Sequence, residues 1–255
     1  MINEFKVNWL INKISDGNVQ GCLDIVLQPC IDIVDSRCVG AEVLIRGTYG
    51  NEMINPEEFI SLSEANGSVL NIDLFSLREG VQFICDNDLL QQSHFRFSFN
   101  FSPYSFNLPD FASLICKEID QKIAHHIILE ITESNIPLNN YAIRNALRLR
   151  EYGFLIAWDD VDSLNYALRT LQYFRFDFAK LDKNLLTNSK ISLIKNLINV
   201  FHNFNTEIIV EGLEEQEQLS MLREMNVRYV QGFLFSPPVS KIDFIHSYSE
   251  KLVVK

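Results

Sequence analysis

Short apolar segments recur along the whole chain, and their spacing constrains the fold more than any other feature. Most are continuous rather than alternating in polarity, which is typical of strands that are buried on both faces. From the third segment onward, helical patterns occupy the gaps, so the sequence predicts a mostly parallel sheet covered by helices. The eight segments are 23–33, 38–45, 95–101, 126–132, 154–160, 176–182, 207–212 and 229–235.

Eight strands that alternate with helices match the number in a closed (β/α)₈ barrel. The first two strands are the exception, because only residues 34–37 separate them and a parallel crossover needs about a dozen residues or more. These two strands should form a hairpin, so we expect an α/β fold: a modified TIM-like barrel with one antiparallel strand. Two helices are predicted at 56–66 and 72–86, and examples in the later gaps are 111–123, 165–174, 191–204 and 214–225.

Composition excludes several classes of protein. The formal net charge is −11, whereas binding to DNA or to an anionic membrane needs a basic face. No window approaches the ~20 apolar residues that span a membrane, and the N-terminus lacks the pattern of a signal peptide. Five cysteines without a CxxC pair are typical of reduced thiols in a cytoplasmic protein. We expect one domain over 21–255, preceded by a short lead-in at 1–20.

Polar side chains lie inside or at the ends of these apolar strands. In a barrel of this class the carboxyl ends of the strands meet at one mouth, where the chemistry is found. Buried carboxylates are costly unless they are paired or bind a metal ion, so several of them at one mouth indicate bound cations. The residues are Glu42, Asn100, Glu130, Asp159, Asp160, Lys180, Glu211 and Gln231.

The adjacent pair Asp159 and Asp160 sharpens this interpretation. Two like charges side by side at the end of a buried strand repel each other unless cations lie between them. Ligands that are all oxygen favour Mg²⁺, Mn²⁺ or Ca²⁺ over zinc. Two adjacent aspartates suit a pair of metal ions about 3.5–4 Å apart, because one carboxylate can bridge both ions while its neighbour binds only one of them.

Seven motifs together give the chain a family resemblance. In this order, and over nearly the whole chain, they resemble the EAL domain family of bacterial cyclic di-GMP (c-di-GMP) phosphodiesterases, so the region 21–255 is identified as an EAL domain. The motifs are EVL (42–44), FNFSP (99–103), LEITES (129–134), WDD (158–160), KLD (180–182), VEGLEEQEQL (210–219) and YVQGFLFSPP (229–238).

The resemblance implies two Mg²⁺ or Mn²⁺ ions and a water between them that attacks a phosphodiester of c-di-GMP to give linear pGpG. One ion would be held by Glu42, Asn100, Glu130 and Asp159, and the other by Asp159, Asp160 and Glu211. Three residues are implied to be catalytic: Lys180, which would orient the water or stabilise charge, Glu211, and Gln231, which would support the same network.

Four further positions match residues that contact the substrate in this family. Arg46 would contact a phosphate, while Gln28, Leu44 and Pro237 would line the groove. Two of these roles have simpler alternatives that the sequence leaves open. Lys180 could be an ordinary ion-pair partner of nearby carboxylates, and Arg46 could form a salt bridge at the rim of the barrel.

The chain departs from the family after the second aspartate. Members usually have Phe-Gly-Thr-Gly there, whereas this chain has Val-Asp-Ser-Leu at 161–164. Glycine supplies backbone conformations that leucine does not tolerate, so we expect the loop to follow a different path. Glu133 would anchor this loop, and Asp162 would add negative charge beside it. We expect residues 161–165 to be displaced without metal. Gly47 is a second departure, because a tryptophan is common at that position.

Two functions therefore remain open. The first is a metal-dependent c-di-GMP phosphodiesterase, with activity reduced by the altered loop. The second is a weak or inactive EAL-like protein that binds c-di-GMP or a protein partner and acts as a regulator. Retention of every predicted metal ligand favours the first, and the altered loop favours the second. A homodimer is also consistent with the family.

Overall fold

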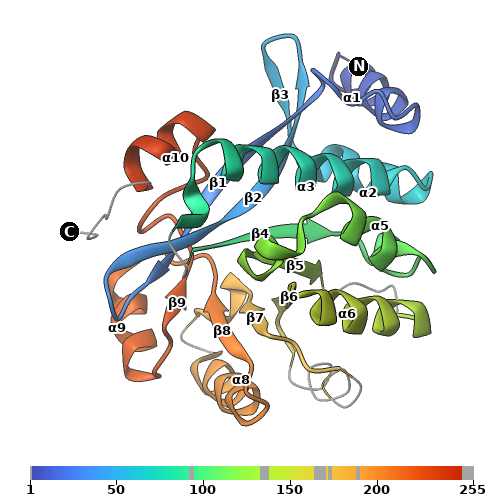
Figure 1. Ribbon diagram of the computed structural model, residues 1–255. Helices are drawn as coiled ribbons and strands as arrows, with labels where there is room; N and C mark the ends of the chain where they lie inside the picture. The colour runs from blue at the N-terminus through green and yellow to red at the C-terminus, as the bar shows by residue number, and fades with distance from the viewer. Residues whose placement is uncertain are drawn as a thin grey trace.

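Eight strands close into a barrel in the computed structural model, and helices cover its outer face (Figure 1). The structure describes residues 2–91, 95–132, 138–163, 171, 174–187 and 190–248. This architecture confirms the predicted TIM-like barrel. The barrel strands are β1 (Leu23–Asp32), β2 (Arg37–Tyr49), β4 (Arg96–Phe101), β5 (Ile127–Thr132), β6 (Leu155–Val161), β7 (Phe178–Leu181), β8 (Glu207–Val210) and β9 (Tyr229–Val230); β3 (Glu52–Ile54) extends β2 as a hairpin.

Helices alternate with the strands from β4 onward, as the sequence predicts, and two helices fill the gap between β3 and β4. The prediction did not include α1, α4 or α10, whereas α6 lies in a gap where a helical pattern was expected. Most of the predicted helix at 165–174 lies outside the described residues. The helices are α1 (Ile2–Ser15), α2 (Pro56–Ala65), α3 (Val69–Asp86), α4 (Pro103–Phe106), α5 (Phe111–Glu118), α6 (Asn140–Tyr152), α8 (Ile191–Asn203), α9 (Gln216–Glu224) and α10 (Lys241–Tyr248), with short 3₁₀ turns η1 (Leu89–Gln91), η2 (Gln121–His126) and η3 (Lys183–Leu185).

The strand β1 runs against both of its neighbours, which confirms the predicted hairpin. It pairs antiparallel with β2, from Leu23–Gly47 to Asp32–Arg37, and antiparallel with β9. Every other pair of neighbouring strands around the ring, from β2 with β4 to β8 with β9, is parallel. The hairpin turn is stabilised by Asp32, whose Oδ1 accepts backbone N–H groups two and three residues ahead, an arrangement typical of Asx turns.

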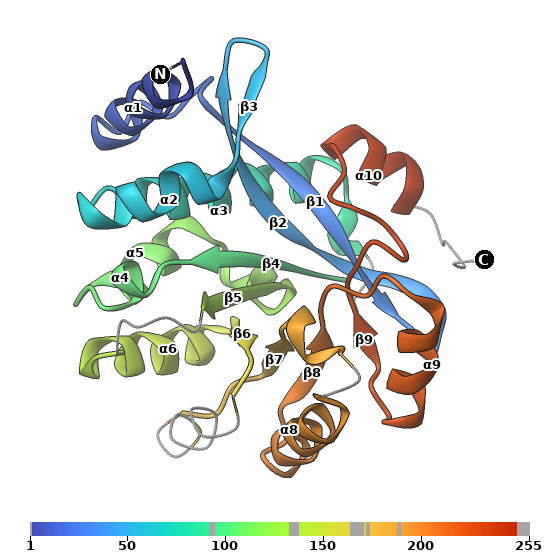
Figure 2. The ribbon, with the colours of Figure 1, turned by 180° about the vertical axis from the view of Figure 1, so that it is seen from behind.

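The pairing of β1 with β9 forms the seam that closes the barrel (Figure 2). It is short, because only Ile31–Val230 and Asp32–Tyr229 pair directly. A two-way backbone bridge between Leu27 and Val239 extends it. An ion pair adds to it, since the exposed Arg228 donates to the buried carboxylate of Asp32 at 2.8 Å. Few contacts therefore join the first barrel strand to the last.

Side chains inside the barrel form layers, because alternate residues of each strand point inward. The lower layer is apolar and consists of Ile128, Ala157, Phe178 and Ile209, with Cys30, Leu155 and Tyr229 packed against it. The outward-pointing residues, such as Phe97 and Phe99 of β4, belong to the separate core between sheet and helices. These apolar residues form the floor beneath the mouth of the barrel.

Gly47 has a structural explanation that the family comparison alone did not provide. A Cβ atom at this position would lie 2.6 Å from Cδ2 of Leu10 and 3.1 Å from both Ile54 and Phe59. Leu10 belongs to α1 and is fully buried, as is Ile14 one turn further along. The absence of a side chain at residue 47 therefore makes room for α1 to pack against β2.

We expect Gly47→Trp to displace α1 and to lower the free energy of unfolding by about 1–3 kcal/mol, as overpacking of cores does. Denaturant unfolding would give the loss, and hydrogen exchange of the α1 amides would show whether the helix has separated. The double variant Gly47→Trp/Leu10→Ala is the control, because the shortened side chain should restore part of the stability. Unchanged stability and exchange in Gly47→Trp would contradict this explanation.

Candidate metal centre

A polar layer lies directly above the apolar floor of the barrel. Five of its members follow a floor residue by two positions along the chain, so both residues of each pair point inward, and Glu42 of β2 completes the layer. The pairs are Ile128 and Glu130, Ala157 and Asp159, Phe178 and Lys180, Ile209 and Glu211, and Tyr229 and Gln231. This period of two brings residues from five segments, far apart in the sequence, to one height in the barrel.

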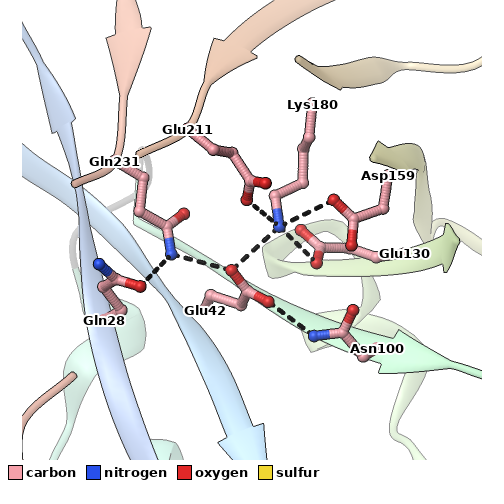
Figure 3. Close-up of polar contacts among 8 residues, drawn as sticks. All are labelled: Gln28, Glu42, Asn100, Glu130, Asp159, Lys180, Glu211 and Gln231. Atoms are coloured by element: carbon pink, nitrogen blue, oxygen red, sulfur yellow. Dashed lines mark hydrogen bonds and ion pairs between the residues drawn. The ribbon is translucent and has the colours of Figure 1, made fainter. Parts of the chain in front are cut away.

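Lys180 lies at the centre of this layer (Figure 3). Its Nζ atom is 2.7 Å from Glu211 Oε1, 2.8 Å from Glu130 Oε2, 3.0 Å from Glu42 Oε2 and 3.3 Å from Asp159 Oδ1. The side chain of Lys180 is only 1% exposed. The predicted residues therefore converge around one buried ammonium group. Lys180 thus forms ion pairs with nearby carboxylates, as the simpler alternative for this residue proposed.

Glu42 is held from both sides. Asn100 donates its amide to Oε1 at 2.6 Å, and Gln231 donates to Oε2 at 2.8 Å. Gln231 also donates to Gln28 Oε1 at 3.2 Å, which ties β1 to the same network (Figure 3). Both carboxylate oxygens of Glu42 thus have polar partners, and its orientation is fixed by residues from three other segments.

The backbone at Asp160 explains how two adjacent aspartates reach one site. Neighbouring residues of a regular strand point to opposite faces, but Asp160 has φ +58° and the pairing of β6 with β7 is irregular between Trp158 and Val161. Aspartate adopts this left-handed conformation more readily than most residues. As a result, carboxylate oxygens of Asp159, Asp160 and Glu211 lie within 4.8 Å of one another.

Burial and crowding shift the pKa values in this layer. Burial raises the pKa of Glu211 to about 8, although Lys180 acts in the opposite direction. Burial also raises the pKa values of Glu130 and Asp159. For Glu42, burial is outweighed by Lys180, Asn100 and Gln231, which hold its pKa below the usual value. Burial alone would lower the pKa of Lys180, but the surrounding carboxylates raise it.

A groove of about 320 Å³ adjoins the polar layer, lined by parts of β2, α2, α3 and the segment after β4. Leu44 and Arg46 lie on its wall together with Asn100. Arg46 donates to the carbonyl of Ile45 at 2.7 Å. It forms no ion pair within the part of the chain that the structure describes, so the rim salt bridge is not found there.

The groove also contains two carboxyl groups that the sequence analysis missed. Asp73 on α3 is buried, and burial raises its pKa to about 7 even though Ser105 and the backbone of Ser102 donate to it. Glu64 on α2 accepts from Ser102 Oγ at 2.7 Å. Both sit within helices rather than at strand ends, so a search of strand ends could not find them.

The remaining predicted residues lie in different places. Gln28 donates to the carbonyl of Ser236 at 3.2 Å, which places the segment around Pro237 beside the network. Glu133 lies outside the described residues, as do Leu164 and Asn165. The sequence analysis treated Val161 as part of the altered loop, but it is the last residue of β6 and is fully buried.

The described part of the altered loop follows ordinary backbone geometry. Asp162 and Ser163 have no positive φ angle, and the residue that adopts one is Asp160. The positive φ angle therefore lies on the strand, two residues before the first of the missing glycines. Within the described ranges, no helix is both long and apolar enough to cross a membrane.

Comparisons with known proteins agree with this geometry. The family described as EAL domain matches residues 11–238. The chain is 27% identical over 236 residues to the cyclic di-GMP phosphodiesterase PdeL of Escherichia coli (strain K12), covering 88% of this chain. Curated relatives are longer, since the chain spans 65% of PdeL and 32% of a relative from Synechocystis sp..

Solved structures show the same fold. The EAL enzyme Bd1971 in its cAMP- and cyclic-di-GMP-bound form matches with a TM-score of 0.85 at 22% identity, covering 99% of this chain and 70% of that chain. The manganese and cyclic-di-GMP complex of Klebsiella pneumoniae BlrP1 matches with a TM-score of 0.73 at 22% identity, covering 86% of this chain and 57% of that chain.

Proposed function

The chain belongs to the EAL domain family, and on that premise we propose that it is a metal-dependent phosphodiesterase that hydrolyses c-di-GMP to linear pGpG. The observation that carries the proposal is the polar layer, in which Glu42, Glu130, Asp159 and Glu211 surround Lys180 at ion-pair distance. Such a concentration of buried carboxylates is costly for a purely structural purpose.

The residues of the layer fit two divalent cations. Five carboxylates (Glu42, Glu130, Asp159, Asp160 and Glu211) lie around one ammonium, and once all five are ionised they would leave four negative charges that two such cations would balance. Glu130 Oε1 is buried and has no hydrogen-bond partner among the described residues, as expected of an atom that serves a metal. The donors are oxygen atoms, which favour Mg²⁺ or Mn²⁺, and the relative BlrP1 was solved with manganese.

The ligands divide between two positions. Glu42, Asn100, Glu130 and Asp159 would hold one ion, and Asp160 and Glu211 would hold the other together with Asp159. Asn100 would have to turn its amide to present oxygen, because its nitrogen now faces Glu42. The second group needs little rearrangement, since its oxygen atoms already lie within 4.8 Å of one another.

The groove beside the layer suits a cyclic dinucleotide. The guanidinium of Arg46 would bind a phosphate, and Leu44 offers an apolar surface for the adjoining sugar or base. Asp73 and Glu64 could accept N–H groups from the edge of a guanine, a pairing that carboxylates make readily. Gln28 and Pro237, on the far side of the polar layer, would contact the other half of the substrate.

Hydrolysis requires one bond to form and one to break. The water oxygen bonds to phosphorus, the bond from phosphorus to the ribose 3′ oxygen breaks, and that oxygen takes a proton to leave linear pGpG. Two bound ions would lower the pKa of the water and neutralise charge on the phosphate. Lys180 would donate to an oxygen of the reacting group once the ions take over some of its carboxylate partners, while Gln231 keeps Glu42 in its orientation.

The direct test is to incubate the protein with c-di-GMP and Mg²⁺ or Mn²⁺ and to separate the nucleotides by chromatography. We expect pGpG to accumulate, and EDTA to stop its formation. Cyclic di-AMP is the matched control substrate, because it offers the same phosphodiesters with a different base edge. No pGpG with either metal, at protein concentrations comparable to the substrate, would refute the enzymatic proposal.

The altered loop supports a second candidate function, a regulator that binds c-di-GMP or a protein partner without turnover. The chain has Asp162, Ser163 and Leu164 where active relatives have a glycine-containing turn. Binding of labelled c-di-GMP without formation of pGpG would identify this function. A homodimer stays a prediction, and sedimentation would test it in the same samples.

A further inference from the structure

Lys180 joins four strands of the barrel through one atom. It projects from β7, and its Nζ contacts Glu42 of β2, Glu130 of β5, Asp159 of β6 and Glu211 just after β8. Figure 3 shows these carboxylates pointing toward the ammonium from different sides. Within the described part of the chain, no other Lys or Arg forms an ion pair with any of the four.

All three N–H donors of the Lys180 ammonium group have carboxylate partners. An ammonium group has three N–H donors, and three contacts, to Glu211, Glu130 and Glu42, have hydrogen-bonding distances of 3.0 Å or less. Asp159 is an ion-pair neighbour at 3.3 Å. All four carboxylates therefore contact one side chain that is itself 1% exposed.

The need for this cation follows from electrostatics. Carboxylates this close repel one another, and the low effective dielectric of the interior strengthens the repulsion. The strand ladders fix the Cα positions, so the carboxylates cannot move far apart without loss of backbone hydrogen bonds. An attractive charge among them therefore stabilises the closed barrel whenever these carboxylates are ionised.

We propose that Lys180 is the resident cation of the metal centre: it holds the ligand carboxylates together before metal binds and shares them with the ions afterwards. This rests on the proposed function, which assigns those carboxylates as metal ligands. Lys180 is in this respect a positioning residue, distinct from any part it has in the reaction. The fold should then depend on metal only when this side chain is lost.

The test compares thermal unfolding of Lys180→Met with that of the natural protein, in EDTA and in saturating Mn²⁺. Loss of the cation should lower the midpoint in EDTA by about 10 °C, and Mn²⁺ should recover most of that loss. Lys183→Met is the matched control, because Lys183 is exposed and forms no ion pair within the described residues. Its midpoint should equal that of the natural protein in both conditions.

An equal loss in EDTA and in Mn²⁺ would overturn the proposal, because a packing role does not respond to metal. If Lys180→Met does not fold in EDTA, the double variant Lys180→Met/Glu130→Gln keeps the test decisive. Removing one negative charge should restore folding, and failure to do so would count against the proposal. If Mn²⁺ stabilises no variant, the ligand assignment fails, whereas rescue by Glu130→Gln would still support Lys180 as the internal cation.

Discussion

Glu42→Gln is expected to lower the metal-dependent turnover of c-di-GMP by more than about a hundredfold while the protein stays folded. Loss of groups that merely support metal ligands commonly costs about 10- to 100-fold, and Glu42 is proposed to be a ligand itself. Glutamine keeps the shape and can still accept hydrogen bonds from Lys180, Asn100 or Gln231, which now donate to Glu42. Initial rates at saturating Mn²⁺ would measure the effect.

Glu207→Gln is the matched control for this substitution. Glu207 is exposed at the start of β8, at the end of the barrel opposite the polar layer, so the same loss of charge there should leave turnover unchanged. Circular dichroism of both variants would establish that they are folded. Turnover by Glu42→Gln within twofold of the natural protein would show that Glu42 is not a ligand needed for hydrolysis.

Restoring the glycines of the altered loop should raise turnover about tenfold or more. The triple variant Asp162→Gly/Ser163→Thr/Leu164→Gly returns the family's backbone freedom and removes a negative charge near the carboxylate cluster. Val161 is kept, because it is fully buried in β6 and a phenylalanine there would overpack the core. The measurement is turnover of c-di-GMP at saturating Mn²⁺.

The single variant Asp162→Asn separates charge from backbone. A gain from this variant alone would mean that repulsion limits the enzyme, and a gain only from the triple variant would mean that backbone geometry does. Equal and substantial turnover in all of them would show that the loop is not a defect. No turnover in any of them, with c-di-GMP still bound, would favour the regulatory function.

Strand positions could be predicted because their signal is local. Each barrel strand is a short apolar segment, and the four residues between the first two segments left a hairpin as the only connection. The positions of the polar residues could be predicted for the same reason, since Glu130 and Asp159 interrupt runs that are otherwise apolar. Their convergence on Lys180 required the barrel, because ring closure brings β2, with Glu42, across from β7, with Lys180.

The features that sequence analysis missed depend on tertiary contacts. Helix α1 has weak amphipathic patterning, so its position follows only from its packing against β2, where Gly47 leaves room for it. Asp73 and Glu64 lie on helices whose orientation toward the groove the sequence does not specify. The positive φ of Asp160 could not be expected at a strand residue, since that conformation is set by the irregular pairing with β7.

The short seam between β1 and β9 has a consequence for how the chain acquires its shape during synthesis. The two sides of the ion pair that supports it, Asp32 and Arg228, are separated by 196 positions in the sequence. A nascent chain therefore carries β1 with an open edge until nearly the whole barrel has been translated, and each newly made strand up to β8 forms the other edge. Unpaired edges of this kind recruit other chains. The last strand is short, so a few late residues convert an aggregation-prone open sheet into a closed ring. Gln231 immediately follows β9, so closure also brings it to Glu42.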